Sequence, residues 1–272
     1  MPYSDSGSAA SLSSHWDKRV ARALELARRF AVAGEVLAFY SEVLQFQRRI
    51  YAELASRAPS PVTTDEPFRS LLDQDDALRH LPALLSLIQE KGTPKLAEEA
   101  AAVRAMPREQ QLEMLQRFLA GEKSANTFFA RALLQPYAEM LAQSRPTLPP
   151  ATTVSACPRC GSPPQAAVLH PEGEGGKRFL LCSLCLTEWE FRRILCPVCG
   201  EEDYRKLPRY SAGEHDSARV EACDTCHFYL KSIDMTIDGL AVPLVDEVAT
   251  VLLDLWASEH GYKKPEPNLM GF

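Results

Sequence analysis

The chain has 272 residues, 46% of them hydrophobic and 24% charged, and a formal net charge of −6. These proportions suit a globular protein of one large or two ordinary domains, and the acidic balance argues against general nucleic-acid binding, which needs surplus lysine and arginine. No apolar run reaches the roughly 20 residues that a membrane-spanning helix needs, and the N-terminus lacks the pattern of a signal peptide. Residues 1–14 are rich in serine, alanine and glycine, so we expect them to be disordered.

Residues 15–145 are predicted to form an all-α helical domain. Within 34–57, apolar residues such as Val36, Tyr40 and Val43 recur every three or four positions, which places them on one helix face. Two further helices are predicted. They cover 107–119, where a proline suits the first turn, and 128–141, where Pro136 is expected to bend the helix. Helix breaks are indicated at 58–61 and 92–94 by proline and glycine. We expect a bundle of five to seven helices.

The predicted secondary structure changes from helices to short strands after a proline-rich stretch, 146–156, which we interpret as a linker. Short strands are predicted over 165–170, 178–182 and 228–233, each bounded by turn residues. A helix follows over 243–259 within a C-terminal segment, 241–272, whose last ten residues are expected to be irregular. The apolar stripe predicted for that helix consists of Leu244, Val245, Val248, Val251, Leu252, Leu255 and Trp256.

All eight cysteines lie between Cys157 and Cys226, and each belongs to a C-x-x-C pair. Without an export signal, metal ligation explains four such pairs better than disulfides or free thiols do. Two cysteines separated by two residues can wrap a tight turn, so that both sulfurs face one ion. Gly161 and Gly200 follow the first and third pairs, where a positive φ would let backbone amides point at the thiolates. His227 follows the fourth pair, but with the cysteine count complete we expect a packing or surface role for it.

The pairs form an internal repeat, because Cys196 lies 39 residues after Cys157, and Cys223 lies 41 after Cys182. The repeat favours two self-contained rubredoxin-like or zinc-ribbon modules, 157–195 and 196–240, and an α+β multidomain fold. An interleaved scheme, first pair with third and second with fourth, stays open. The sequential scheme that we prefer places Cys157, Cys160, Cys182 and Cys185 in site 1, and Cys196, Cys199, Cys223 and Cys226 in site 2. Four thiolates with a divalent ion leave a charge of −2, and their softness suits zinc and iron alike.

Three stretches of the second half resemble the family of the formate dehydrogenase accessory protein FdhE. They are Leu-Cys-Ser-Leu-Cys-Leu-Thr-Glu-Trp at 181–189, Glu-Ala-Cys-Asp-Thr-Cys-His-Phe-Tyr-Leu-Lys at 221–231, and the 246–262 segment that includes Asp-Glu-Val-Ala-Thr and Glu-His-Gly-Tyr. The resemblance implies a cytoplasmic, non-catalytic assembly factor that is needed for active respiratory formate dehydrogenase and contacts its catalytic subunit before export. It also implies rubredoxin-type iron, so we expect two metal ions per chain, with iron preferred and zinc as the alternative.

Three other functions are compatible with cysteine pairs in a small module. Two adjacent iron sites would suit rubredoxin-like electron transfer, whereas zinc has no redox chemistry. A nucleic-acid-binding zinc ribbon is disfavoured, because residues 151–240 carry 10 lysines and arginines against 13 aspartates and glutamates. A thiol-disulfide oxidoreductase is also disfavoured, because it would need a C-x-x-C that opens a helix, whereas the pairs here lie among turns and strands. Homo-oligomerisation is left open, and so is the use of Trp189, Phe191, Phe228 and Tyr229 as anchors for a client, although we expect at least half of these four to pack in the core.

Overall fold

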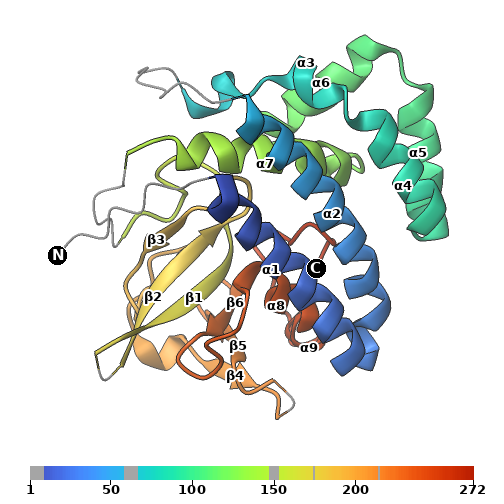
Figure 1. Cartoon of the computed structure of the whole chain (residues 1–272). Helices are drawn as coiled ribbons and strands as arrows, with labels where there is room; N and C mark the ends of the chain where they lie inside the picture. Colours follow the sequence, from blue (N-terminus) through green and yellow to red (C-terminus); the bar gives the residue numbers. More distant parts are fainter. Residues whose placement is uncertain (1–8, 58–66, 147–152, 174, 214) are drawn as a thin grey trace.

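The computed structural model describes residues 9–57, 67–146, 153–173, 175–213 and 215–272. Its first part is helical, and its second part is a mixed sheet followed by two short helices (Figure 1). The α-helices of the first part are α1 (Ala9–Arg29), α2 (Gly34–Ser56), α3 (Gln74–Leu78), α4 (Leu81–Lys91), α5 (Pro94–Ala105), α6 (Arg108–Leu119) and α7 (Thr127–Gln143). The described helices of this part fall within the predicted range.

The helices predicted from periodicity are confirmed. Helix α2 buries the expected face, including Tyr40 and Val43, while α6 and α7 match the other two predictions, and α7 continues through Pro136. The break predicted at 92–94 separates α4 from α5, and the one at 58–61 lies outside the described residues. Of the segment 1–14 that we expected to be disordered, residues 1–8 lie outside the described residues, and residues 9–14 belong to α1, which begins at Ala9. The alanines there are strong helix formers and extend α1 backwards.

Six strands form one sheet in the order β3-β2-β1-β6-β5-β4. The first repeat supplies β1 (Pro164–Glu172), β2 (Gly175–Cys182) and β3 (Glu188–Glu190), and the second supplies β4 (Arg209–Ser211), β5 (Ala218–Ala222) and β6 (Tyr229–Asp234). Neighbours within each repeat are antiparallel, whereas β1 and β6 pair in parallel, with Val168 opposite Ile233. The two repeats are therefore not self-contained, because a ladder of backbone hydrogen bonds joins them.

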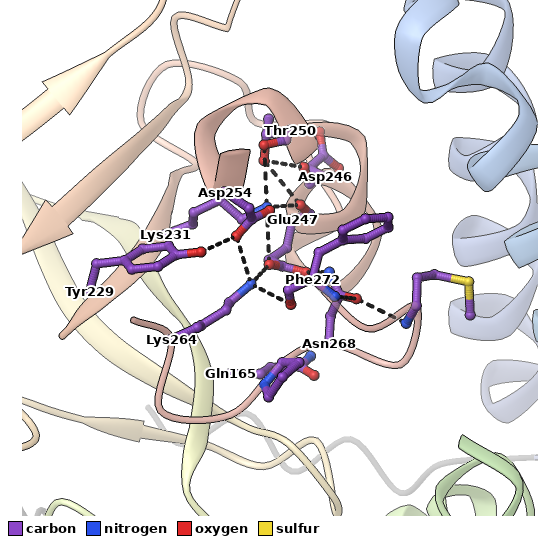
Figure 2. A network of polar contacts seen from close by, with 12 residues as sticks. Gln165, Tyr229, Lys231, Asp246, Glu247, Thr250, Asp254, Lys264, Asn268 and Phe272 are labelled. Carbon is purple, nitrogen blue, oxygen red and sulfur yellow. Dashed lines mark hydrogen bonds and ion pairs between the residues drawn. The ribbon is translucent and has the colours of Figure 1, made fainter. Parts of the chain in front are cut away.

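The predicted C-terminal helix is divided at Thr250 into α8 (Pro243–Ala249) and α9 (Val251–Glu259). The ammonium group of Lys231 on β6 donates to the carbonyl oxygens of Glu247 and Thr250 (Figure 2). The hydroxyl of Thr250 also donates to the carbonyl of Glu247, at 3.0 Å. Because these carbonyls have partners outside the helical ladder, the helix can end there and restart in another direction. The predicted apolar stripe is consequently broken, and Leu252 and Leu255 are exposed.

The apolar core shows how the parts are held together. One cluster of buried side chains runs from the helices of the first part through β1 and β2 to α8, which packs against α1, β1 and β6 (Figure 1). A smaller cluster joins β5 and β6 to α9. The tail after α9 is irregular, as expected, but its Asn268 and Leu269 are buried. Among the described helices, none is long and apolar enough to cross a membrane.

Candidate metal centres

The first cysteine group lies at one end of the β1–β2 hairpin. Cys157 and Cys160 occupy the turn before β1, Cys182 ends β2, and Cys185 lies in the turn that leads to β3. The Sγ atoms of Cys157 and Cys185 are 3.5 Å apart, and those of Cys160 and Cys182 are 3.4 Å apart. All four residues are buried.

The second group repeats this arrangement. Cys196 and Cys199 lie in the turn that follows the first repeat, and Cys223 and Cys226 lie between β5 and β6. The Sγ distances are 3.7 Å from Cys196 to Cys226 and 3.6 Å from Cys199 to Cys223. Unlike the first group, this one reaches the surface, because Cys199 is exposed and Cys226 is half-buried.

Both groups fit a tetrahedral ion. Within each group the four sulfurs lie within 4.8 Å of one another. A metal–sulfur bond of about 2.3 Å implies sulfurs about 3.8 Å apart at the corners of a tetrahedron, close to the distances found here. The structure thus brings the cysteines together in the two sets that the sequential scheme expected. The donor chemistry suits zinc and iron equally, so it does not choose between them.

Each C-x-x-C pair is followed by a residue with a left-handed backbone. The φ angles are 72° at Gly161 and 77° at Gly200, as the sequence predicted. The corresponding residues of the other two pairs are Leu186, at 56°, and His227, at 58°. An L-residue with a side chain adopts this conformation at a cost of about 1 to 2 kcal/mol, so a left-handed backbone could not be predicted at Leu186 or His227 from residue type.

The left-handed residue closes the turn around the sulfurs. In all four turns the N–H of the first cysteine donates to a carbonyl five residues later; for Cys157 the acceptor is Ser162, and for Cys223 it is Phe228. Backbone amides also reach the sulfurs, since the N–H groups of Leu184 and Cys185 donate to Cys182 Sγ at 3.3 and 3.4 Å. Such N–H donors stabilise thiolates and orient them toward an ion.

Burial makes two of the cysteine thiols harder to ionise. It raises the pKa of the Cys182 thiol and that of Cys196. Because an ion binds thiolates and not thiols, filling either group would release protons, and binding would weaken as the pH falls.

Two arginines of the helical part hold the first group. Arg69 donates through Nε to the carbonyl of Cys160, at 2.9 Å, and through Nη2 to the hydroxyl of Ser162, at 3.0 Å. Arg131, on α7, donates through Nε to the carbonyl of Ser183, at 2.9 Å, and Gln135 donates to the same oxygen at 3.1 Å. Both turns of the first group are therefore fixed by hydrogen bonds from outside the sheet.

The second group has different partners. Its contacts come from the tail after α9, where Tyr262 donates to Asp224 at 2.6 Å and the N–H of Lys263 donates to the carbonyl of His227 at 2.8 Å. Among the described residues, no hydrogen bond from α1–α7 reaches the turns of this group. Sequence reasoning missed this difference, because Arg69 and Arg131 are single arginines in a helical region and carry no motif.

The four aromatic residues considered as client anchors mostly belong to the core. Trp189, Phe191 and Tyr229 are buried, and the indole N–H of Trp189 donates to the carbonyl of Val154 at 2.8 Å. Phe228 is half-buried. The expectation that at least half of the four pack in the core is confirmed, and only Phe228 remains partly accessible.

Comparisons with known proteins agree on one family. The family models for the FdhE central domain and the FdhE C-terminal domain match residues 156–193 and 194–270. The chain is 31% identical to the FdhE homolog of Aquifex aeolicus over 260 residues, which cover 91% of this chain and 92% of that protein. It is 40% identical to the Pseudomonas aeruginosa homolog over 122 residues, which cover 42% and 38%. The crystal structure of the FdhE protein from Pseudomonas aeruginosa superposes with a TM-score of 0.74 at 25% identity, covering 95% of this chain and 96% of that one.

Proposed function

We propose that this chain, which belongs to the FdhE family, is a non-catalytic cytoplasmic accessory protein that binds the catalytic subunit of respiratory formate dehydrogenase before export. The observation that carries the proposal is its relation to an FdhE homolog along 91% of its length, together with two complete four-cysteine groups. Three parts of the proposal rest on the family resemblance: that the partner is the catalytic subunit, that the chain is cytoplasmic, and that it is not a catalyst.

The cysteine groups give this role a physical basis. An ion in each group, which we propose to be iron with zinc as the alternative, supplies a cross-link that stabilises the folded state. The thiolates of the chain would bind the ion, and Arg69 and Arg131 attach the first group to the helical part through hydrogen bonds. The result is a rigid sheet with turns of fixed shape, and such a surface can bind a client without losing much conformational entropy.

The test is a complementation and binding experiment. In a strain that lacks this protein, the wild-type chain should restore formate dehydrogenase activity and co-purify with the catalytic subunit. Serine in place of all eight cysteines should abolish both, whereas serine at an exposed position away from the groups, such as Ala101→Ser on α5, should have no effect. Normal formate dehydrogenase activity in the strain without the protein would contradict the proposal.

Electron transfer is the second candidate, and the exposure of Cys199 favours it. A sulfur ligand at the surface shortens the path to a redox partner, which a wholly buried group does not. This role requires iron in the second group. Elemental analysis with an optical spectrum would test it: an absorbance that bleaches and recovers at the rate of formate turnover supports electron transfer, and a colourless zinc protein contradicts it.

A further inference from the structure

A cavity of about 410 Å³ lies beside the second cysteine group, where the two repeats meet. One wall is the segment that leaves the first repeat, from Arg193 to Val198, and the other walls come from Tyr204, from β5 and from Phe228. Its volume falls within the range of roughly 300 to 1,000 Å³ that is typical of ligand pockets.

Exposed apolar side chains gather around the cavity. Of the ten large hydrophobic residues that are exposed in the described chain, three line it: Tyr204 at 70%, Ile194 at 49% and Val198 at 41% exposure. A single exposed hydrophobic residue needs no explanation, but a group of them around one hollow is typical of a surface that binds another molecule.

The charges at the cavity are unbalanced. Arg178, Arg193 and Arg209 line it, against one carboxylate, Glu221. Arg178 binds that carboxylate through Nε at 2.9 Å, and Arg209 lies 3.9 Å from it. Arg193 is exposed and donates only to the carbonyl of Gly176, at 3.2 Å; among the described residues, no carboxylate lies within 4.0 Å of it.

The second cysteine group also borders the cavity, through Cys196 and Cys223. A filled group carries negative charge, which repels a carboxylate from that wall. The guanidinium of Arg193 is therefore the place where an incoming carboxylate gains a partner, while Ile194 and Val198 offer apolar contact on the same segment. A fork of N–H donors also suits the two oxygens of a carboxylate.

We propose that this cavity, called the cleft from here on, binds an extended protein segment in which an aspartate or glutamate lies next to a bulky apolar side chain. The identity of the partner, the catalytic subunit of formate dehydrogenase, rests on the function proposed above; the chemistry of the segment does not. Because the turn from Cys196 to Cys199 forms part of the wall, an ion in the second group also fixes the shape of the cleft.

The direct test uses synthetic peptides and the full-length, zinc-loaded chain. The probe is an eight-residue peptide with one aspartate between phenylalanine and leucine in a glycine-serine background. One matched peptide has lysine for aspartate, and another has serine for both apolar residues. We expect the first peptide alone to bind and to shift the backbone amide resonances of Ile194, Val198 and Tyr204. Equal binding of the lysine peptide, or no binding of any peptide, would overturn the proposal.

Variants then locate the site. Arg193→Glu should weaken binding of the aspartate peptide by about tenfold or more, because it puts a carboxylate where the peptide's own must sit. Arg193→Lys should retain part of the affinity. The matched control is Arg108→Glu on α6, which makes the same change of charge at an exposed arginine far from the cleft. A peptide that binds Arg193→Glu as tightly as wild type would rule the cleft out.

Binding of the catalytic subunit separates this inference from the proposed function. If wild type and Arg108→Glu co-purify with the subunit and Arg193→Glu does not, both proposals are supported. If all three co-purify equally, the function stands and the cleft is not its docking site. If wild type itself does not bind the subunit, the proposed function fails, and the peptide titrations still decide whether the cleft binds acidic-apolar segments.

Discussion

The ammonium group of Lys231 lies 3.1 Å from Oε1 of Glu247, and both side chains are fully buried (Figure 2). Lys264 reaches the same carboxylate from the tail, and Asn268 donates to its other oxygen at 2.6 Å. Asp254 forms ion pairs with both lysines and also accepts from Tyr229, at 2.8 Å. The network ties β6 of the second repeat to α8, to α9 and to the tail.

Removing the charge of Glu247 should destabilise the protein strongly. Glu247→Gln leaves two buried lysines facing one aspartate, and breaking a buried ion pair in this way costs about 3 to 5 kcal/mol. Urea unfolding of the zinc-loaded protein at pH 7 measures the loss in the free energy of unfolding. Glu259→Gln at the exposed end of α9 is the control, and we expect it to change that free energy little. Equal stability of the two variants would contradict a structural role for the network.

The same substitution should lose its effect in acid. Burial by itself would raise the pKa of Glu247, but Lys231 and Lys264 outweigh it and hold that pKa at about 2. A carboxyl whose pKa is lower in the folded state stabilises the protein above its ordinary pKa of about 4.5, and this stabilisation is lost as the pH falls toward 2.

The difference in unfolding free energy between wild type and Glu247→Gln should therefore be smaller at pH 3 than at pH 7. Acid also protonates the cysteine thiolates, but it does so in both proteins, so that effect cancels in the difference. A difference that stays constant between these two pH values would show that Glu247 does not hold a depressed pKa.

The two cysteine groups should release their ions at different rates. Because Cys199 is exposed and, in the described part of the chain, no hydrogen bond from α1–α7 reaches the turns of the second group, a chelator should reach its ion first. Mixing zinc-loaded protein with excess 4-(2-pyridylazo)resorcinol should give two phases of absorbance change of equal amplitude. Cys199→Ser should remove the fast phase, and Cys160→Ser should remove the slow one. A single phase with both ions released at one rate would contradict the assignment.

The slow phase should depend on Arg131. Arg131→Met removes the hydrogen bond to the carbonyl of Ser183 and leaves that buried oxygen with Gln135 as its remaining side-chain donor. We expect faster release from the first group and an unchanged fast phase from the second. Arg108→Met, at an exposed arginine on α6, is the matched control and should alter neither phase.

Substitutions at two left-handed positions should change the stability of the protein in opposite directions, depending on whether glycine is introduced or removed. Leu186→Gly should relieve the backbone cost at a φ of 56° and stabilise the protein by about 1 kcal/mol, less whatever the leucine contributes through packing. Gly200→Ala should destabilise it by a similar amount, and purely through backbone strain, because nothing lies within 4 Å of the added methyl group. Thermal unfolding of the zinc-loaded variants measures both. Stabilisation by Gly200→Ala would contradict the role of the positive φ.

What was predictable depended on how local the physical cause is. A C-x-x-C turn is closed by a hydrogen bond between residues five apart, so each cysteine pair and the glycine after Cys160 were predictable from local sequence. Which two turns meet at one site is not local, and the repeat favoured the sequential scheme without excluding the interleaved one. The amphipathic period of α2 is equally local. The break at Thr250 was missed because its cause is Lys231, which lies 19 residues earlier in the chain and meets the helix only through the fold.

The helical first part, the four C-x-x-C pairs and the family could be predicted from the order of the residues, because periodicity, spacing or a contiguous motif indicates each of them. The three-dimensional fold was needed to learn that β1 and β6 join the repeats in one sheet. It was also needed to learn that Arg69 and Arg131 support one cysteine group while the other lies at the surface beside a cleft. Those features depend on which residues, distant in the sequence, the fold brings within hydrogen-bonding distance, and the amino-acid sequence alone does not contain those distances.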